Sequence, residues 1–136
     1  MSSENAAKSK ILICDDDKSV TEFLERFLKN EGYNQVEVVS GGAEVLEKVV
    51  RQHYDLVLLD IKMPGMDGIE VLQLIKKVDE KAAVVMITGF PEENLAAQAL
   101  KMGAYDYIVK PFDLAYLKLV VFSRILLDPG KQKKHE

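Results

Sequence analysis

Polar residues able to do chemistry follow several short apolar runs of this chain. Asp15 and Asp16 come directly after Lys10–Cys14, and Asp60 closes the run Leu56–Leu59. An apolar run without alternation is typical of a strand buried on both faces of a parallel sheet. A carboxylate at the carboxyl end of such a strand lies where open α/β sheets bind ligands. The spacing therefore predicts a charged ligand site centred on Asp60.

The simpler interpretation of Asp60 is a turn residue or a helix N-cap. The residues Asp67-Gly-Ile-Glu70 already supply a start of the capping-box type for the following helix. Asp60 is therefore not needed as a helix cap and is available for a chemical role. The Thr88 hydroxyl and the Lys110 ammonium also follow apolar runs, so we expect three carboxylates, one hydroxyl and one ammonium to meet at one edge of the sheet.

The elements that must hold these residues alternate along the chain. Strands are predicted at Lys10–Cys14, Val36–Val39, Leu56–Asp60, Ala82–Ile87 and Tyr105–Val109, with a helical apolar pattern after each. Strict alternation with short connections predicts a doubly wound α/β fold, with a parallel sheet and helices on both faces.

Bulk composition limits the function classes. The chain has 136 residues with 48% hydrophobic and 29% charged residues, which fits one globular domain. A net charge of −4 argues against a nucleic-acid-binding surface. The single cysteine, Cys14, is expected to be a buried structural thiol. Without a membrane-length apolar stretch or a signal core, we expect a cytoplasmic protein that does not contact a membrane.

The same residues carry a family resemblance. The chain resembles the receiver domains of two-component response regulators from about Lys10 to Leu127. The matching residues are Asp15, Asp16, Asp60, Pro64, Gly68, Thr88, Lys110 and Pro111. The resemblance implies a five-stranded, flavodoxin-like (βα)5 sheet in the order 2-1-3-4-5. We expect a receiver domain at residues 10–127, a disordered tail at 1–9, and a tail or linker at 128–136.

The resemblance also implies a reaction. Asp60 would take a phosphoryl group from the phosphohistidine of a sensor histidine kinase or a phosphotransfer protein. Mg²⁺, or Mn²⁺ in its place, would be held by Asp15, Asp16, Asp60 and the backbone carbonyl of Lys62. Asp15 would act partly through water. Asp17 is better interpreted as a helix N-cap.

Other positions receive roles by the same resemblance. Lys110, before a cis-proline at Pro111, would stabilise charge on the phosphoryl oxygens. Thr88 would move toward the phosphoryl group, and Tyr107 would be the switch aromatic unless it is a plain strand residue. Lys62 and Phe90 would tune the lifetime of the phosphorylated state by controlling access of water.

The last predicted helix, from Asp113 to about Leu127, is more apolar than packing on a sheet requires. One stripe suited to the core consists of Leu114, Leu117, Val121 and Ile125. A second set consists of Tyr116, Leu119, Phe122 and Leu126. This second set is either the flank of a wide core face or a contact surface, and we expect a homodimer or docking to an output partner.

Two alternatives from other functional classes stay open. A haloacid-dehalogenase-like phosphatase usually has a second aspartate two residues after its nucleophile, where this chain has Lys62. A receiver-like scaffold that takes no phosphate would not need the complete set of site residues. We expect a module that catalyses its own phosphorylation rather than an enzyme that turns over a separate substrate.

Overall fold

The structure is a computed structural model that describes residues 6–63, 65–89 and 93–127. Its main sheet contains five parallel strands: β1 (Lys10–Cys14), β2 (Gln35–Val39), β3 (Leu56–Asp60), β6 (Ala83–Thr88) and β7 (Asp106–Val109). Their order across the sheet is β2-β1-β3-β6-β7. Counting these strands alone gives 2-1-3-4-5, so the predicted topology is confirmed.

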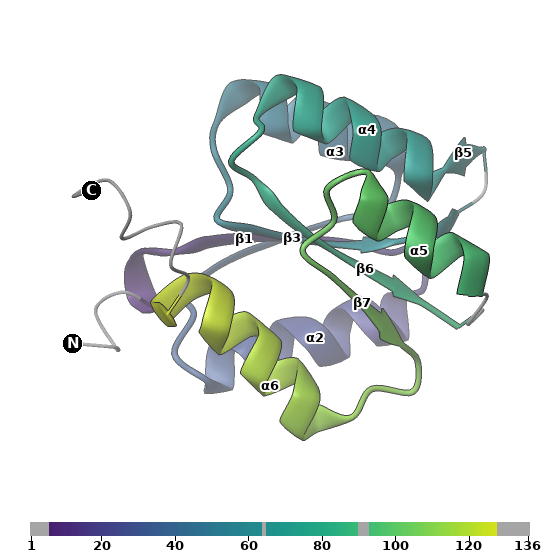
Figure 1. Cartoon of the computed structure of the whole chain (residues 1–136). Coiled ribbons are helices and arrows are strands. Elements are labelled where there is room, and N and C mark those ends of the chain that lie inside the picture. Colours follow the sequence, from purple (N-terminus) through teal and green to yellow (C-terminus); the bar gives the residue numbers. More distant parts are fainter. Residues whose placement is uncertain (1–5, 64, 90–92, 128–136) are drawn as a thin grey trace.

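In the part of the chain that the structure describes, the helices α2 to α6 cover the two faces of this sheet. Their bounds are α2 (Lys18–Asn30), α3 (Gly42–Arg51), α4 (Gly68–Val78), α5 (Glu93–Lys101) and α6 (Leu114–Phe122). In Figure 1, α3, α4 and α5 lie above the sheet, while α2 and α6 lie below it. Each face therefore has its own apolar core, one containing Leu12, Val57 and Leu72 and the other Ile13, Leu58 and Leu117. The central strands are buried on both faces, as their unbroken apolar runs predict.

Short polar residues begin three of these helices. The side chains of Asp17, Asp67 and Asp113 accept hydrogen bonds from backbone N–H groups two residues further on. Such caps satisfy donors that have no partner inside the helix. At the other end of α2, Gly32 has a φ of +100°, a conformation that side chains disfavour. The predicted starts at Asp17, Asp67 and Asp113 are confirmed.

A small hairpin follows Asp60 and was not predicted. β4 (Lys62–Met63) pairs antiparallel with β5 (Met66–Asp67). Gly65 has a φ of +78° in the turn between them. The sequence shows turn residues here, but a ladder of two residue pairs is too short to leave a periodic pattern. Its effect is to return the chain to the end of β3.

The predicted disordered tail is wrong for residues 6–9. Residues 6–8 form a helical turn, and the side chains of Ala6 and Ser9 are buried. Ala6 packs in the lower core beside Leu28 and Tyr33, and the side chain of Gln35 donates a hydrogen bond to the Ala7 carbonyl at 3.0 Å. Burial of small residues against α2 and β2 therefore orders a segment whose polar composition suggested otherwise.

The predicted core stripe of the last helix needs two corrections. Leu117, Val121 and Ile125 are buried as predicted, but Leu114 is 47% exposed and Val120 is buried instead. Beyond Phe122 the helix widens to a π-helix, η1 (Ser123–Leu127). The wider turn changes which residues face the sheet, and Arg124 is buried within it.

No helix in the described ranges combines the length and the apolar character that crossing a membrane requires.

Candidate functional site

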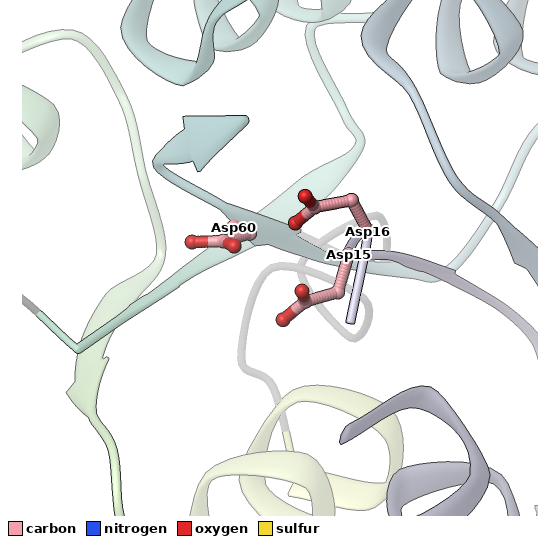
Figure 2. A group of neighbouring side chains, drawn as sticks. All are labelled: Asp15, Asp16 and Asp60. Atoms are coloured by element: carbon pink, nitrogen blue, oxygen red, sulfur yellow. The ribbon is translucent and has the colours of Figure 1, made fainter. Parts of the chain in front are cut away.

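The carboxyl edge of the sheet brings Asp15, Asp16 and Asp60 together. Cys14 pairs with Leu59 in the parallel register, so the residues that follow β1 and the end of β3 are neighbours. Each of the three residues has a carboxylate oxygen within 4.8 Å of one on the others. Figure 2 shows the three side chains projecting to the same side of these strand ends. The three carboxylates therefore form a cluster in the folded protein, as predicted.

Two of the three carboxylates are buried. Asp15 is 2% exposed and Asp60 is 5% exposed, whereas Asp16 is exposed. Burial, followed by the negative charge of Asp15, raises the pKa of Asp60 to about 6, although Lys110 opposes the rise. The Asp60 carboxylate thus lies in an environment that disfavours its negative charge in the absence of a further cation.

Lys110 is the cation that contacts both buried carboxylates. Its Nζ donates to Asp15 Oδ2 at 2.8 Å and lies 3.7 Å from Asp60 Oδ2. Burial alone would lower the pKa of Lys110, but the hydrogen bond to Asp15 and the charges of Asp60 and Asp15 outweigh it and raise that pKa. The Lys110–Pro111 peptide bond is cis, as expected. The ammonium therefore lies where it can also meet an anionic group bound at Asp60.

The donor set of this edge fits a hard divalent cation. Three carboxylates with one paired ammonium leave an excess of negative charge at the site. Mg²⁺ prefers carboxylate and carbonyl oxygens as ligands. The acidic cluster is therefore of the kind that binds a magnesium ion.

The backbone after Asp60 holds its carboxylate from one side. The Lys62 N–H donates to Asp60 Oδ1 at 3.2 Å, and the Ile61 N–H donates to the Ile87 carbonyl at 3.0 Å. The Lys62 side chain is exposed. Asp60 is thus fixed by a turn that the β4–β5 hairpin continues.

Thr88 lies on β6, the strand next to that of Asp60, and Tyr107 lies on β7, one strand further out. Asp60 is opposite Ile87 in the register, and Thr88 is the next residue, completely buried. The Thr88 carbonyl accepts a hydrogen bond from the Lys110 N–H at 2.8 Å. Tyr107 is partly buried against the upper core. Phe90, predicted to control water access, lies outside the described residues.

Two supporting contacts were not predicted from the sequence. The Asp17 N–H donates to Asp15 Oδ1 at 3.0 Å, so the backbone of the acidic run helps to fix the Asp15 carboxylate. Cys14 Sγ contacts Met63 Sδ at 3.4 Å beneath the site. Burial, with Asp15 and Asp60 adding to the effect, raises the pKa of the Cys14 thiol to about 12. Cys14 is therefore the buried, unreactive thiol that its strand context predicted.

Comparisons with known proteins agree with this geometry. The response regulator receiver domain family matches residues 11–122. The chain is 38% identical over 105 residues to sporulation initiation phosphotransferase F of Bacillus subtilis, covering 77% of this chain and 84% of that protein. It is 35% identical over 127 residues to the regulatory protein AtoC of Escherichia coli, covering 93% of this chain. The chain spans only 27% of the length of AtoC.

Solved structures give the same result. A CheY-like receiver domain protein from Methanospirillum hungatei superposes with a TM-score of 0.83 at 30% identity, covering 94% of this chain and 98% of that one. CheY in a complex with CheX, BeF₃ and Mg²⁺ from Borrelia burgdorferi gives a TM-score of 0.80 at 36% identity, with 85% and 87% coverage. The phosphatase and scaffold alternatives are not favoured by these relatives. The chain belongs to the response regulator receiver domains, the phosphoacceptor modules of two-component signalling.

Proposed function

We propose that Asp60 is the phosphoacceptor and that its donor is the phosphohistidine of a sensor histidine kinase or a phosphotransfer protein. The observation that carries this assignment is the position of the Asp60 carboxylate. It is 5% exposed, lies 3.7 Å from the Lys110 ammonium, and belongs to the cluster with Asp15 and Asp16. A cytoplasmic location, typical of the family, is part of the same proposal.

In the proposed reaction, an Asp60 carboxylate oxygen attacks the phosphorus atom. The new bond joins that oxygen to phosphorus, the P–N bond to the histidine breaks, and the imidazole leaves with the electron pair and takes up a proton. Lys110 stabilises negative charge on the phosphoryl oxygens, since its Nζ already lies between Asp15 and Asp60.

Mg²⁺, or Mn²⁺, would be held by the carboxylates of Asp15, Asp16 and Asp60 and by the backbone carbonyl of Lys62. When bound, the ion neutralises charge between the carboxylates and the incoming phosphoryl oxygens. The excess of carboxylate charge at this edge supports the assignment. Because Asp15 is engaged by Lys110 and by the Asp17 N–H, we expect it to act partly through water.

We further propose that Thr88 and Tyr107 form the switch. Thr88 would donate its hydroxyl to the phosphoryl group, and Tyr107 would turn inward as the loop after β6 moves. Their strands support this, because Thr88 follows the residue opposite Asp60 and Tyr107 pairs with Met86 on the same strand as Thr88. Structures with and without beryllofluoride should differ at both side chains, and unchanged Thr88 and Tyr107 would rule the switch out.

The lifetime of the phosphorylated state is assigned to Lys62 and Phe90. Lys62 lies beside the site, since its N–H contacts the Asp60 carboxylate and its side chain is exposed. The role of Phe90 stays a prediction from the family position.

The output surface is proposed on α5, β7 and α6. Exposed apolar or aromatic side chains lie on these elements or directly before β7: Leu100, Tyr105, Val109, Tyr116, Leu119 and Phe122. Large apolar side chains that stay exposed on a folded domain are typical of a contact site where they form a patch. The beryllofluoride-activated receiver domain of NtrC4 is a dimer, and it resembles this chain with a TM-score of 0.80 at 29% identity. We therefore propose homodimerisation or docking of an output partner here.

Phosphorylation by acetyl phosphate tests the central assignment. Intact-protein mass spectrometry should show one added phosphoryl group in the presence of Mg²⁺ and none when the ion is chelated. Asp60→Asn should abolish the addition. The matched control is Asp17→Asn, because asparagine also caps a helix and the same charge is removed close to the site. Equal labelling of Asp60→Asn and the wild type would refute the assignment.

A further inference from the structure

Gly68, at the start of α4, lies against the backbone that follows Asp60 at the end of β3. The β4–β5 hairpin brings the chain back so that α4 begins at Gly68. The Gly68 N–H donates to the Ile61 carbonyl at 2.9 Å. The first residue of α4 therefore contacts the peptide that follows Asp60.

A side chain at Gly68 would not fit this contact. A Cβ there would lie 2.6 Å from both Ile61 Cα and Ile61 O, and 2.8 Å from Asp60 O. All three are backbone atoms, so no rotamer change of a neighbour could relieve the overlap. Among the glycines that the structure describes, Gly32, Gly65 and Gly103 have a positive φ, and Gly68 does not. The need at Gly68 is therefore for space and not for an unusual backbone conformation.

The same backbone segment carries the proposed site. The Lys62 N–H donates to Asp60 Oδ1 at 3.2 Å, so a displacement of the peptide at Ile61 is passed to the carboxylate. The Lys62 carbonyl, proposed as a metal ligand, belongs to the next peptide. Asp67 fixes the other side of the contact, because its carboxylate accepts a hydrogen bond from the Ile69 N–H at 3.0 Å and caps α4.

We propose that Gly68 is a positioning residue for the phosphoacceptor. Its missing side chain lets the first turn of α4 lie directly against the Asp60–Ile61 backbone, and this contact sets the Asp60 carboxylate and the Lys62 carbonyl in the geometry that the metal and the phosphoryl group require. The inference rests on the proposed function of Asp60. It differs from a purely structural role, in which Gly68 would affect stability alone.

Gly68→Ala tests the proposal in three measurements. These are Mg²⁺ affinity by calorimetry, the amide chemical shift of Lys62 without Mg²⁺, and the initial rate of labelling by acetyl phosphate. We expect the Lys62 amide to shift and Mg²⁺ affinity to fall by about tenfold, the lower range for loss of a group that orients a metal ligand. The labelling rate at subsaturating Mg²⁺ should fall with the affinity.

Two controls separate position from stability. Leu72→Ala removes a buried side chain of the same helix and lowers stability without adding an atom to the contact between Gly68 and Ile61. Gly41→Ala adds a Cβ whose nearest neighbour is Glu44 Oε1 at 3.9 Å, an ordinary contact. Both should keep wild-type Mg²⁺ affinity at a temperature where every variant is folded. Unchanged Mg²⁺ affinity and an unshifted Lys62 amide in folded Gly68→Ala would overturn the proposal.

Should Gly68→Ala fail to fold, Asp67→Ala carries the test. This substitution adds no atom at Gly68, but it removes the helix cap that holds Gly68 against Ile61. Mg²⁺ affinity should therefore fall. An unchanged Mg²⁺ affinity would refute the positioning role. The two hypotheses also fail separately. A wild type that binds Mg²⁺ but is not labelled at Asp60 would disprove the proposed function, whereas a labelled wild type with a normal Gly68→Ala would disprove only the role of Gly68.

Discussion

Lys110 is the residue on which the charge balance of the site depends. Its ammonium contacts Asp15 at 2.8 Å and lies 3.7 Å from Asp60, and both carboxylates are buried. Two buried carboxylates this close are costly unless a cation compensates them. Within the described residues Lys110 supplies part of that compensation, and a bound divalent ion would supply more.

Lys110→Met should therefore make stability strongly dependent on Mg²⁺. Without the ion we expect a loss of about 2 kcal/mol, because Asp15 loses its ionic partner while remaining buried. Saturating Mg²⁺ should recover much of this loss, since the ion stabilises the folded state that binds it. Urea unfolding with and without Mg²⁺ measures both quantities, with Lys118→Met as a surface control. An equal loss in both conditions would contradict this charge balance.

The residues of the site were predictable because parallel strands align their carboxyl ends at one edge. Asp15, Asp60 and Lys110 could be brought together from the apolar runs that precede them. The close approach at Gly68 could not, because it depends on backbone atoms of Asp60 and Ile61 that a sequence pattern does not record. The motif resemblance marked Gly68 as a match without giving its reason.

At the scale of elements, α6 shows where helical periodicity stops being informative. The pattern identified Leu117, Val121 and Ile125 as core, but it missed Val120 and placed the exposed Leu114 inside. An almost wholly apolar helix offers several equivalent stripes, so packing decides among them. The π-helix from Ser123 then places Arg124 under the sheet. A change of helical pitch cannot be predicted from a 3.6-residue period.

Arg124 fixes the end of this helix to the sheet. Its Nε donates to the Asp55 carbonyl at 3.0 Å and its Nη2 donates to the Lys81 carbonyl at 3.1 Å. Asp55 precedes β3 and Lys81 precedes β6, so one side chain joins η1 to the connections before two central strands. Loss of such bonds leaves carbonyls without their charged donor.

Arg124→Met should lower the free energy of unfolding by about 2–3 kcal/mol, since two hydrogen bonds from a charged donor are removed. Methionine keeps an unbranched apolar stem, so the packing loss is limited. Lys118→Met is the matched control, because Lys118 pairs with Glu31 at 3.6 Å on the surface and should contribute no more than about 0.5 kcal/mol. Denaturant unfolding compares the two. Similar losses in both variants would mean that Arg124 does not anchor the helix.

At the scale of the whole molecule, the phosphoacceptor and the proposed output surface occupy different parts of the fold. The site lies at the carboxyl edge of the sheet, and α6 lies along its lower face (Figure 1). β7 connects the two regions, because Tyr107 lies on it and Lys110 follows it. Between α6 and α2 there is also a groove of about 440 Å³. Its lining includes the apolar side chains of Phe27, Leu119 and Phe122 and the charged side chains of Glu31 and Lys118. The exposed face of α6 therefore carries large apolar side chains, and a groove borders it.

We expect this face to form a homodimer when the site is phosphorylated. Leu119 is 57% exposed, Tyr116 is 41% exposed and Phe122 is 38% exposed, so pairing would remove several large side chains from water. Phosphorylation would increase the population of the pairing state, since a ligand favours the conformation that binds it better. Sedimentation of the wild type with beryllofluoride and Mg²⁺ should show a dimer that is weaker or absent without them. Phe122→Glu should prevent it, because dimerisation would bury an unpaired carboxylate.

The matched control for this prediction is Val50→Glu. Val50 lies on α3 and is 67% exposed, so it receives the same change on the other side of the sheet. The Val50→Glu protein should dimerise like the wild type. If both variants lose the dimer, general charge rather than the α6 face controls assembly. A wild type that stays monomeric with and without beryllofluoride would exclude the homodimer, and the exposed face of α6 would then have to serve a different protein.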